Sequence, residues 1–299
     1  MFPAQNRRQF LTAIAGLSVS QIAFGQSSAL TTTKLTDNIS LISGAGSNVL
    51  VLNTRDGVLM VDGGGAEHSA DLMKVAAGPV RVLFNTHWHL DHTGSNEAVA
   101  RTGAKIIAHE NTKLWMGAEI ISMWEHKTYP PRPKEARPSA TFYTKDKITF
   151  GKEEIQYGYL GQAHTDGDIY VFLPGPNILV TGDVFTVGSY PVMDYTTGGW
   201  IGGLSDASKT LAALGDAQTR VIPGSGPLQT HADLQAQADM CAEMRTRFVG
   251  MMRKGMSAKD MLASAPTKEF DARWGDPQLF ILNAYPGLWA HVREIGGIV

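Results

Sequence analysis

Three histidines and one aspartate lie within six consecutive residues, and this cluster constrains the chain more than any other feature. The segment reads Thr86-His87-Trp88-His89-Leu90-Asp91-His92 and follows a short β-rich run, 80–85. Alternate side chains of an extended chain point to one side, so His87 and His89 should face the same space. A turn after His89 would bring Asp91 and His92 to that space from another direction. Four ionisable side chains crowded at a strand end are costly unless a metal ion uses them. The pattern therefore predicts a metal site.

The composition limits what kind of metal site this can be. Cys241 is the one cysteine of the 299 residues, which excludes both a cysteine-rich zinc site and an intramolecular disulfide framework. The ligands must then be histidines and carboxylates. A net charge of −2 gives no basic footprint for nucleic acid, so we expect a small-molecule substrate and no nucleic-acid partner. The 43% hydrophobic and 18% charged residues exclude a disordered chain.

Residues 1–28 are predicted to be an export signal. Arg7 and Arg8 precede an uncharged, mildly apolar stretch, 10–24, and a polar segment follows. This stretch is shorter than the about 20 apolar residues that cross a bilayer, and the paired arginines resemble a twin-arginine signal. No cysteine lies nearby to carry a lipid anchor. We therefore expect a periplasmic or secreted protein with one domain, 29–299. The alternative is a cytosolic protein with an amphipathic N-terminal helix.

The remaining chain alternates between short β-rich runs and stretches with helical spacing, which favours α/β layers. Strands are expected at 39–43, 48–53, 58–62, 80–85, 105–108, 147–150, 154–160, 169–173, 177–181 and 220–223. Helices are expected at 67–77, 95–101, 111–126, 205–214, 228–253, 257–265 and 277–295, with Ser205 as the N-cap of the fourth. The four prolines within 129–138 predict a loop.

Together these features resemble the metallo-β-lactamase superfamily over nearly the whole predicted mature chain. The segments that carry the resemblance are the H-x-H-x-D-H motif at 87–92, Gly161-Gln162-Ala163-His164-Thr165-Asp166-Gly167-Asp168, and Val180-Thr181-Gly182-Asp183-Val184-Phe185. The resemblance implies an α/β fold, the four-layer αβ/βα sandwich of that family. It also implies a first zinc site of His87, His89 and His164. The second site would use Asp91 and His92, with Asp183 touching both ions.

One turn departs from the family's pattern. The family usually closes its second site with the histidine of a Pro-Gly-His-Gly turn, and the matching turn here is Pro223-Gly224-Ser225-Gly226. A serine hydroxyl is neutral and a poor zinc ligand. A water held by Ser225 could fill the gap, His231 could reach in, or the second site could be weak or empty. We favour a second ion bound more weakly than the first, so the cofactor is one or two Zn²⁺.

The resemblance implies an enzyme, and three readings of it follow. The first is a zinc-dependent hydrolase in which metal-bound hydroxide attacks the carbonyl of a lactam, lactone, ester or thioester, with β-lactams as one option. Asp91 would then orient the water or hold the second ion. The second is an oxidoreductase of the same fold with one iron, similar to persulfide dioxygenases. The third is a metal-stabilised binding protein without turnover. An acid beside an open coordination position argues against the third.

Several further residues are candidates for the surroundings of the metal. Metal-binding histidines need acceptors for their outer N–H groups, and Thr86, Asp62 and Thr165 are placed to act on them. Trp88 should point away from the ligands into the packing layers. Candidates for the pocket wall are the aromatic and imidazole side chains that precede or enter the proline-rich loop, namely Trp115, Trp124, His126 and Tyr129.

Overall fold

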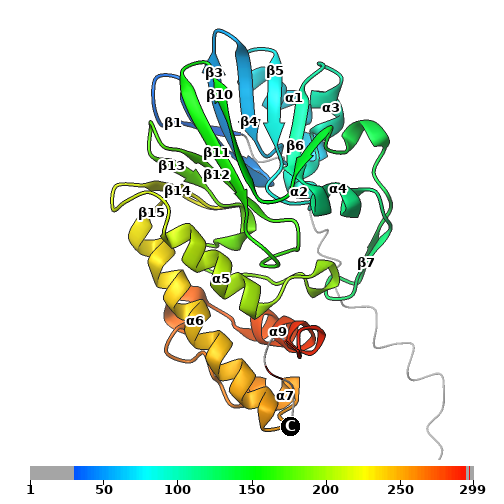
Figure 1. Cartoon of the computed structure of the whole chain (residues 1–299), viewed down its shortest axis with the longest axis vertical. Coiled ribbons are helices and arrows are strands. Elements are labelled where there is room, and N and C mark those ends of the chain that lie inside the picture. The colour runs from blue at the N-terminus through cyan, green and yellow to red at the C-terminus, as the bar shows by residue number, and fades with distance from the viewer. Residues whose placement is uncertain (1–29, 294–295, 297–299) are drawn as a thin grey trace, which may run out of the picture.

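The computed structural model describes residues 30–293 and 296, so the predicted export signal lies outside the described residues. Two β-sheets form the centre of the molecule (Figure 1). The first sheet has the order β1-β2-β3-β4-β5-β6-β9. Its strands are β1 (Thr31–Lys34), β2 (Ile39–Ala45), β3 (Ser47–Thr54), β4 (Gly57–Val61), β5 (Val80–Phe84), β6 (Lys105–His109) and β9 (Ala140–Phe142). Its strands pair antiparallel from β1 to β4 and parallel from β4 to β9.

The second sheet has the order β10-β11-β12-β13-β14-β15. Its strands are β10 (Lys145–Phe150), β11 (Glu153–Tyr159), β12 (Ile169–Leu173), β13 (Ile178–Val180), β14 (Arg220–Ile222) and β15 (Gln229–Thr230). All neighbours are antiparallel except β13 and β14. A separate two-stranded hairpin, β7 (Ile120–Ser122) with β8 (Lys127–Tyr129), stands apart from both sheets.

Three apolar clusters explain why the elements stack in four layers. On β3, Leu50 and Leu52 point into the cluster between the two sheets, whereas Val49 and Val51 point outward. The outward cluster includes Leu72 of α1 (Ser69–Val75) and Val99 of α3 (Asn96–Ala100). Both faces of the first sheet are therefore covered, which is why its central strands are apolar without alternation.

The third cluster lies on the outer face of the second sheet. Leu179 and Val221 of that sheet pack there against α5 (Ile201–Ala212), α6 (His231–Arg253) and α9 (Gln278–Ala290). The short helices α7 (Ala258–Ala263) and α8 (Asp271–Trp274) complete this layer (Figure 1). The order helix, sheet, sheet, helix confirms the predicted four-layer α/β sandwich. No helix among the described residues is long and apolar enough to cross a membrane.

Several predicted helices were wrong in their bounds, and two of them show why. The stretch 111–126 is α4 (Glu110–Met116) followed by the β7–β8 hairpin. The apolar residues there fit helical spacing, but after Gly117 they alternate, with Ile120 buried and Ile121 exposed. The helix predicted from Ser205 begins at Ile201 and includes Gly202 and Gly203. A Cβ at Gly203 would lie 1.8 Å from the Gln162 carbonyl oxygen, so this glycine permits close packing inside a helix.

Candidate metal centre

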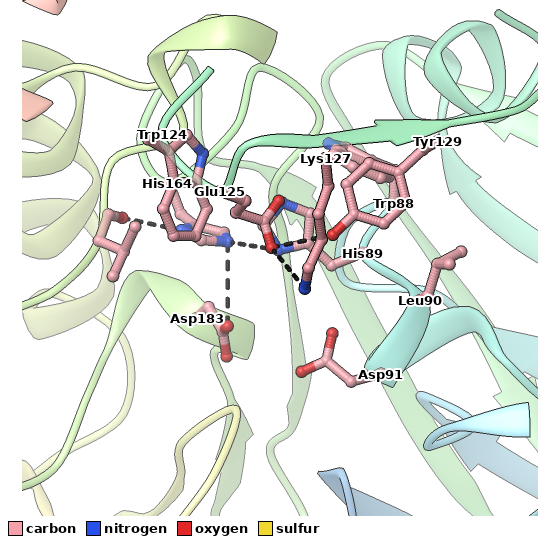
Figure 2. Close-up of a pocket in the computed structure, with 11 residues that line it drawn as sticks. Trp88, His89, Leu90, Asp91, Trp124, Glu125, Lys127, Tyr129, His164 and Asp183 are labelled. Atoms are coloured by element: carbon pink, nitrogen blue, oxygen red, sulfur yellow. Dashed lines mark hydrogen bonds and ion pairs between the residues drawn. The ribbon is translucent and has the colours of Figure 1, made fainter. Parts of the chain in front are cut away.

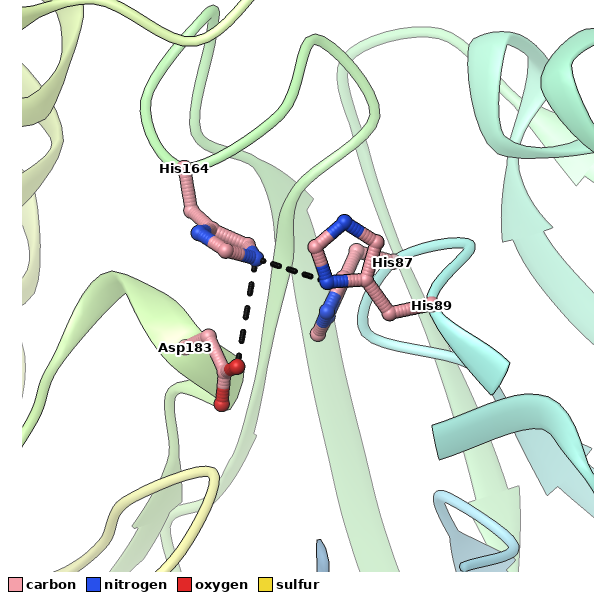
Figure 3. A group of neighbouring side chains, drawn as sticks. All are labelled: His87, His89, His164 and Asp183. Carbon is pink, nitrogen blue, oxygen red and sulfur yellow. Dashed lines mark hydrogen bonds and ion pairs between the residues drawn. The ribbon is translucent and has the colours of Figure 1, made fainter. Parts of the chain in front are cut away.

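The H-x-H-x-D-H motif lies where β5 ends and the chain turns into the short helix α2 (Leu90–Thr93). His87 and His89 come from the extended part, and His164 comes from the loop between β11 and β12. One ligand atom from each of His87, His89, His164 and Asp183 lies within 4.8 Å of the others (Figure 3). The structure therefore brings together residues from three distant parts of the chain, as the sequence predicts.

Each of the three imidazoles is held from behind by a hydrogen-bond acceptor. His164 Nδ1 lies 2.8 Å from the Val192 carbonyl oxygen, which can only accept, so this nitrogen carries the proton. His89 Nε2 lies 3.3 Å from Asp194 Oδ2. His87 Nδ1 lies 3.1 Å from Thr86 Oγ1. The Thr86 hydroxyl itself donates to Asp62 Oδ2 at 2.8 Å, so it accepts from His87.

These bonds leave three nitrogen lone pairs facing one space. His89 Nδ1 and His164 Nε2 are 3.2 Å apart. In two neutral rings whose outer nitrogens carry the protons, both of these atoms are acceptors, so they cannot form a hydrogen bond with each other. His87 Nε2 is buried and has no hydrogen-bond partner among the described residues. A buried nitrogen without a partner is costly unless something binds it. The donor set thus fits a divalent ion, because imidazole nitrogens with outer acceptors are common metal ligands.

Asp183 lies between this triad and His92. Its Oδ1 is 3.2 Å from His92 Nε2. Its Oδ2 is 3.8 Å from His164 Nε2 (Figure 3). It sits in the one-turn helix η3 (Gly182–Val184) directly after β13. Gly224 packs against it, since a Cβ at Gly224 would lie 1.7 Å from Asp183 Oδ1. A carboxylate in this position can touch ions on both sides.

His92 is fixed on its other side by Asp62, whose Oδ2 lies 2.8 Å from His92 Nδ1. Asp62 also accepts from the Thr86 amide at 2.8 Å. Its φ of 62° is in the left-handed region, which non-glycine residues rarely adopt. Asp62 and Thr86 therefore both contact a histidine ring, as their candidate roles require. Thr165 bonds to Asp168 instead and does not touch a histidine ring.

The charges of the metal-free cluster depend on one another. Burial, followed by the neighbouring histidines, holds the pKa of His87 well below its usual range. Burial also disfavours a charged His92, but the carboxylates of Asp183 and Asp62 outweigh it and raise the pKa of His92 well above its usual range. Asp183 is affected in the opposite sense, since His92 outweighs burial and lowers the pKa of this carboxyl. Without an ion, a His92 imidazolium between these two carboxylates offsets part of their negative charge.

Asp91 and Ser225, on the second side of the centre, lie less close to the other candidate ligands. The Asp91 side chain is 53% exposed, and its Oδ2 lies 3.9 Å from His92 Nε2. Ser225 is exposed and lines a neighbouring cavity, together with Gly46, Ser47 and Asn48, instead of the metal pocket. His231 does not reach in, because it lies at the start of α6 and its Nε2 bonds to the Ala212 carbonyl oxygen. Nothing in the described part of the chain brings an imidazole other than His92 to the second side.

A pocket of about 470 Å³ opens over the cluster (Figure 2). Asp91, Asp183, His89 and His164 line it on the side of the metal centre. The wall consists of Trp88, Leu90, Val192 and four residues of the β7–β8 hairpin, Trp124, Glu125, Lys127 and Tyr129. Trp88 is 2% exposed and packs against Met116 and Ile120, as predicted, yet part of it also faces the pocket.

Of the predicted wall residues, Trp124 and Tyr129 line the pocket, and Trp115 and His126 do not. Trp115 donates to Asp166 instead. Asp194 was not predicted as a site residue; it also accepts from Trp124 Nε1 at 3.0 Å and from Thr197 Oγ1 at 2.6 Å. Asp168 was not predicted either, and its Oδ2 accepts the His164 amide at 2.7 Å. Asp194 lies in none of the segments that carry the family resemblance, whereas Asp168 ends the 161–168 segment, so only Asp168 had a signal in the sequence.

Comparison with known proteins gives one family. The sequence profile described as the Metallo-beta-lactamase superfamily matches residues 42–225, more than half of the chain. A curated relative is the metallo-beta-lactamase type 2 of Bacillus sp. (strain 170), 28% identical over 144 residues, which are 46% of this chain and 49% of that protein. The chain covers no more than about half the length of the curated relatives it matches.

Solved structures show the same fold. A metallo-beta-lactamase from Pontibacter korlensis superposes with a TM-score of 0.58 at 21% identity, covering 71% of this chain and 99% of that one. A stereoselective inverting sec-alkylsulfatase from Pseudomonas sp. superposes with a TM-score of 0.63 at 14% identity, covering 86% of this chain and 47% of that one. At these identities the likeness shows the fold alone.

Proposed function

The chain belongs to the metallo-β-lactamase superfamily, and on that premise we propose that it is a zinc-dependent hydrolase of a small carbonyl compound, a lactam, lactone, ester or thioester. The observation that carries the proposal is the convergence of three imidazole lone pairs and Asp183 in a pocket open to ligands. His87, His89, His164 and Asp183 would hold the first ion. A bound Zn²⁺ supplies Lewis acidity that makes water nucleophilic near neutral pH.

The protein's own groups would then position the reactants. Asp91 lines the pocket and is half exposed, so it can accept a hydrogen bond from the attacking water and orient it. The outer contacts of the imidazoles, at Asp194, Val192 and Thr86, fix which nitrogen faces the ion. Trp88, Trp124 and Tyr129 offer an apolar wall for the body of the substrate. Catalysis here depends on holding water and carbonyl in fixed geometry.

The second site is proposed to bind its ion more weakly than the first. Asp91, His92 and Asp183 remain available for it, but Ser225 provides no imidazole and is turned to the neighbouring cavity. A second ion would stabilise the leaving group, so its weak binding should slow departure of that group most. β-Lactams stay among the proposed substrates, but this gap is untypical of an efficient β-lactamase. We also propose twin-arginine export to the periplasm or beyond.

The second candidate function is an oxidoreductase with one iron. Two histidines and a carboxylate with open positions are also the donor set of non-haem iron enzymes, and Asp183 stands beside His87 and His164 here. A weak second site is compatible with this reading.

Metal analysis of the purified protein, together with a panel of lactam, lactone, ester and thioester substrates, tests the proposal. We expect zinc and metal-dependent hydrolysis of at least one class, abolished by a chelator and restored by zinc. His231→Ala is the matched control, because this histidine bonds away from the centre. Iron with oxygen consumption would favour the second candidate. A metal-loaded protein that hydrolyses none of the panel would contradict the proposed function.

A further inference from the structure

The β7–β8 hairpin supplies one wall of the pocket above the metal centre. It lies between α4 and β9 in the chain, and two contacts fix it to the residues around the metal centre. Trp124 donates to Asp194, which also contacts His89. The Tyr129 ring stands edge-on to Trp88, with ring centroids 5.3 Å apart. These contacts hold the hairpin in a fixed position in the pocket wall.

Glu125 contributes a negative charge to this wall. Its side chain is 18% exposed, and Tyr129 donates its hydroxyl proton to Glu125 Oε1 at 2.9 Å. Burial, followed by the hydrogen bond to Glu125, raises the pKa of the Tyr129 phenol, so the phenol keeps its proton and stays a donor. The carboxylate is therefore held against the pocket and does not swing freely into solvent.

Lys127 is the one lysine or arginine among the described residues that line the pocket. Its Nζ lies 3.7 Å from Glu125 Oε1, and its side chain is 64% exposed. The ammonium group is thus largely hydrated and already paired with a carboxylate. The other charged lining residues, Asp91 and Asp183, are acidic and lie at the metal centre. The wall offers no free cation to an anionic group of a substrate.

We infer that Glu125 makes this pocket select neutral carbonyl substrates with an apolar or aromatic body over substrates that carry a carboxylate. The inference rests on the proposed function and narrows its substrate class to neutral lactones and esters ahead of acidic lactams. A carboxylate on the substrate would have to lie beside Glu125 or displace it from Lys127. Repulsion between two carboxylates without a compensating cation disfavours the acidic substrate, and such repulsion is a common source of specificity.

A pair of matched probes tests this without turnover. 4-Mercaptobenzoate and 4-mercaptobenzamide have nearly the same shape, and each presents a thiolate, a ligand that zinc favours. The para group cannot chelate the same ion and points away from it. Calorimetric titration of the zinc-loaded, full-length protein gives the ratio of the two dissociation constants. We expect the amide to bind up to about fivefold more tightly, the range of partly exposed charge pairs.

Three variants make the reading specific. Glu125→Gln should remove or reverse the preference, because it leaves Lys127 unpaired. Lys127→Gln should enlarge it. Glu154→Gln is the matched control, since Glu154 is a carboxylate paired with Lys147 at 2.7 Å on the second sheet, and it should leave the ratio unchanged.

Equal binding of the two probes, a preference for the benzoate, or a ratio unaffected by Glu125→Gln would overturn the inference. Failure of both probes to bind would also overturn it, because the aromatic wall would then not receive ligands. The ratio of the two dissociation constants does not depend on hydrolysis. The substrate panel can therefore fail while the probe preference is found, and the probe preference can fail while the panel shows hydrolysis.

Discussion

The two sides of the metal centre come from one short motif, yet they differ in how firmly their groups are held. On the first side His87, His89 and His164 are buried or nearly so, and each outer nitrogen has an acceptor. On the second side His92 is equally fixed by Asp62, but Asp91 is half exposed. The turn that should close this side presents Ser225 to another cavity. Candidate ligands that are neighbours in the sequence can thus belong to two sites whose side chains are held with unequal firmness.

The largest expected effect comes from breaking the first side. His164→Ala removes a lone pair that faces the ion, and the remaining groups cannot complete the triad. We expect a loss of metal affinity greater than the about 10–100-fold typical of outer partners. Metal content after dialysis, measured by atomic emission, gives the result. Retention of one full equivalent by this variant, with an unchanged circular dichroism spectrum, would show that His164 is not a ligand.

Asp194→Asn tests whether the order of the first side depends on its outer contacts. The amide can still accept from Trp124 but no longer offers a carboxylate to His89 Nε2. We expect metal affinity to fall by about 10–100-fold, with no loss of fold. A competition titration with a chromophoric chelator measures this. Asp216→Asn, an exposed aspartate that bonds to Asn177, is the control and should bind metal as the parent does.

Ser225→His should sharpen the comparison by supplying the missing imidazole to the second side. We expect tighter binding of a second ion, seen as a second equivalent in calorimetry, and faster turnover where leaving-group departure is slow. To bind that ion, the new side chain must rotate from the neighbouring cavity toward Asp183. Unchanged stoichiometry together with an unchanged rate would mean that our account of the turn is wrong.

The smallest effect concerns stability of the metal-free protein in acid. Burial opposes ionisation of Asp194, but the hydrogen bond and charge of His89 outweigh it and lower its pKa to about 2, from 3.8. A depressed pKa stabilises the fold above pH 3.8, and this contribution disappears as the pH falls toward 2. It amounts to about 2 kcal/mol. Urea unfolding from pH 5 to pH 2.5 should show a shallower decline for Asp194→Asn. An equal decline in both proteins would count against this coupling.

The sequence predicted the parts of the centre that periodicity and motif carry. Alternation placed His87 and His89 on one side, and the succession of β-rich runs and helical stretches indicated the α/β layers. The hairpin could not be predicted, because Ile120 and Trp124 fit helical spacing as well as alternation. Asp194 could not be predicted either, since its partners His89 and Trp124 lie 105 and 70 residues away in the chain. Long-range hydrogen bonds leave no mark on local pattern.

The close packing of Gly224 on Asp183 has an evolutionary consequence for the turn. A side chain at 224 would displace the carboxylate that both sides share, so this position cannot vary without cost. Its neighbour at 225 faces solvent and is free to change. A library randomised across both codons should return glycine at the first and a broad range of residues at the second. The turn can therefore gain or lose a ligand in a single substitution while its backbone stays the same.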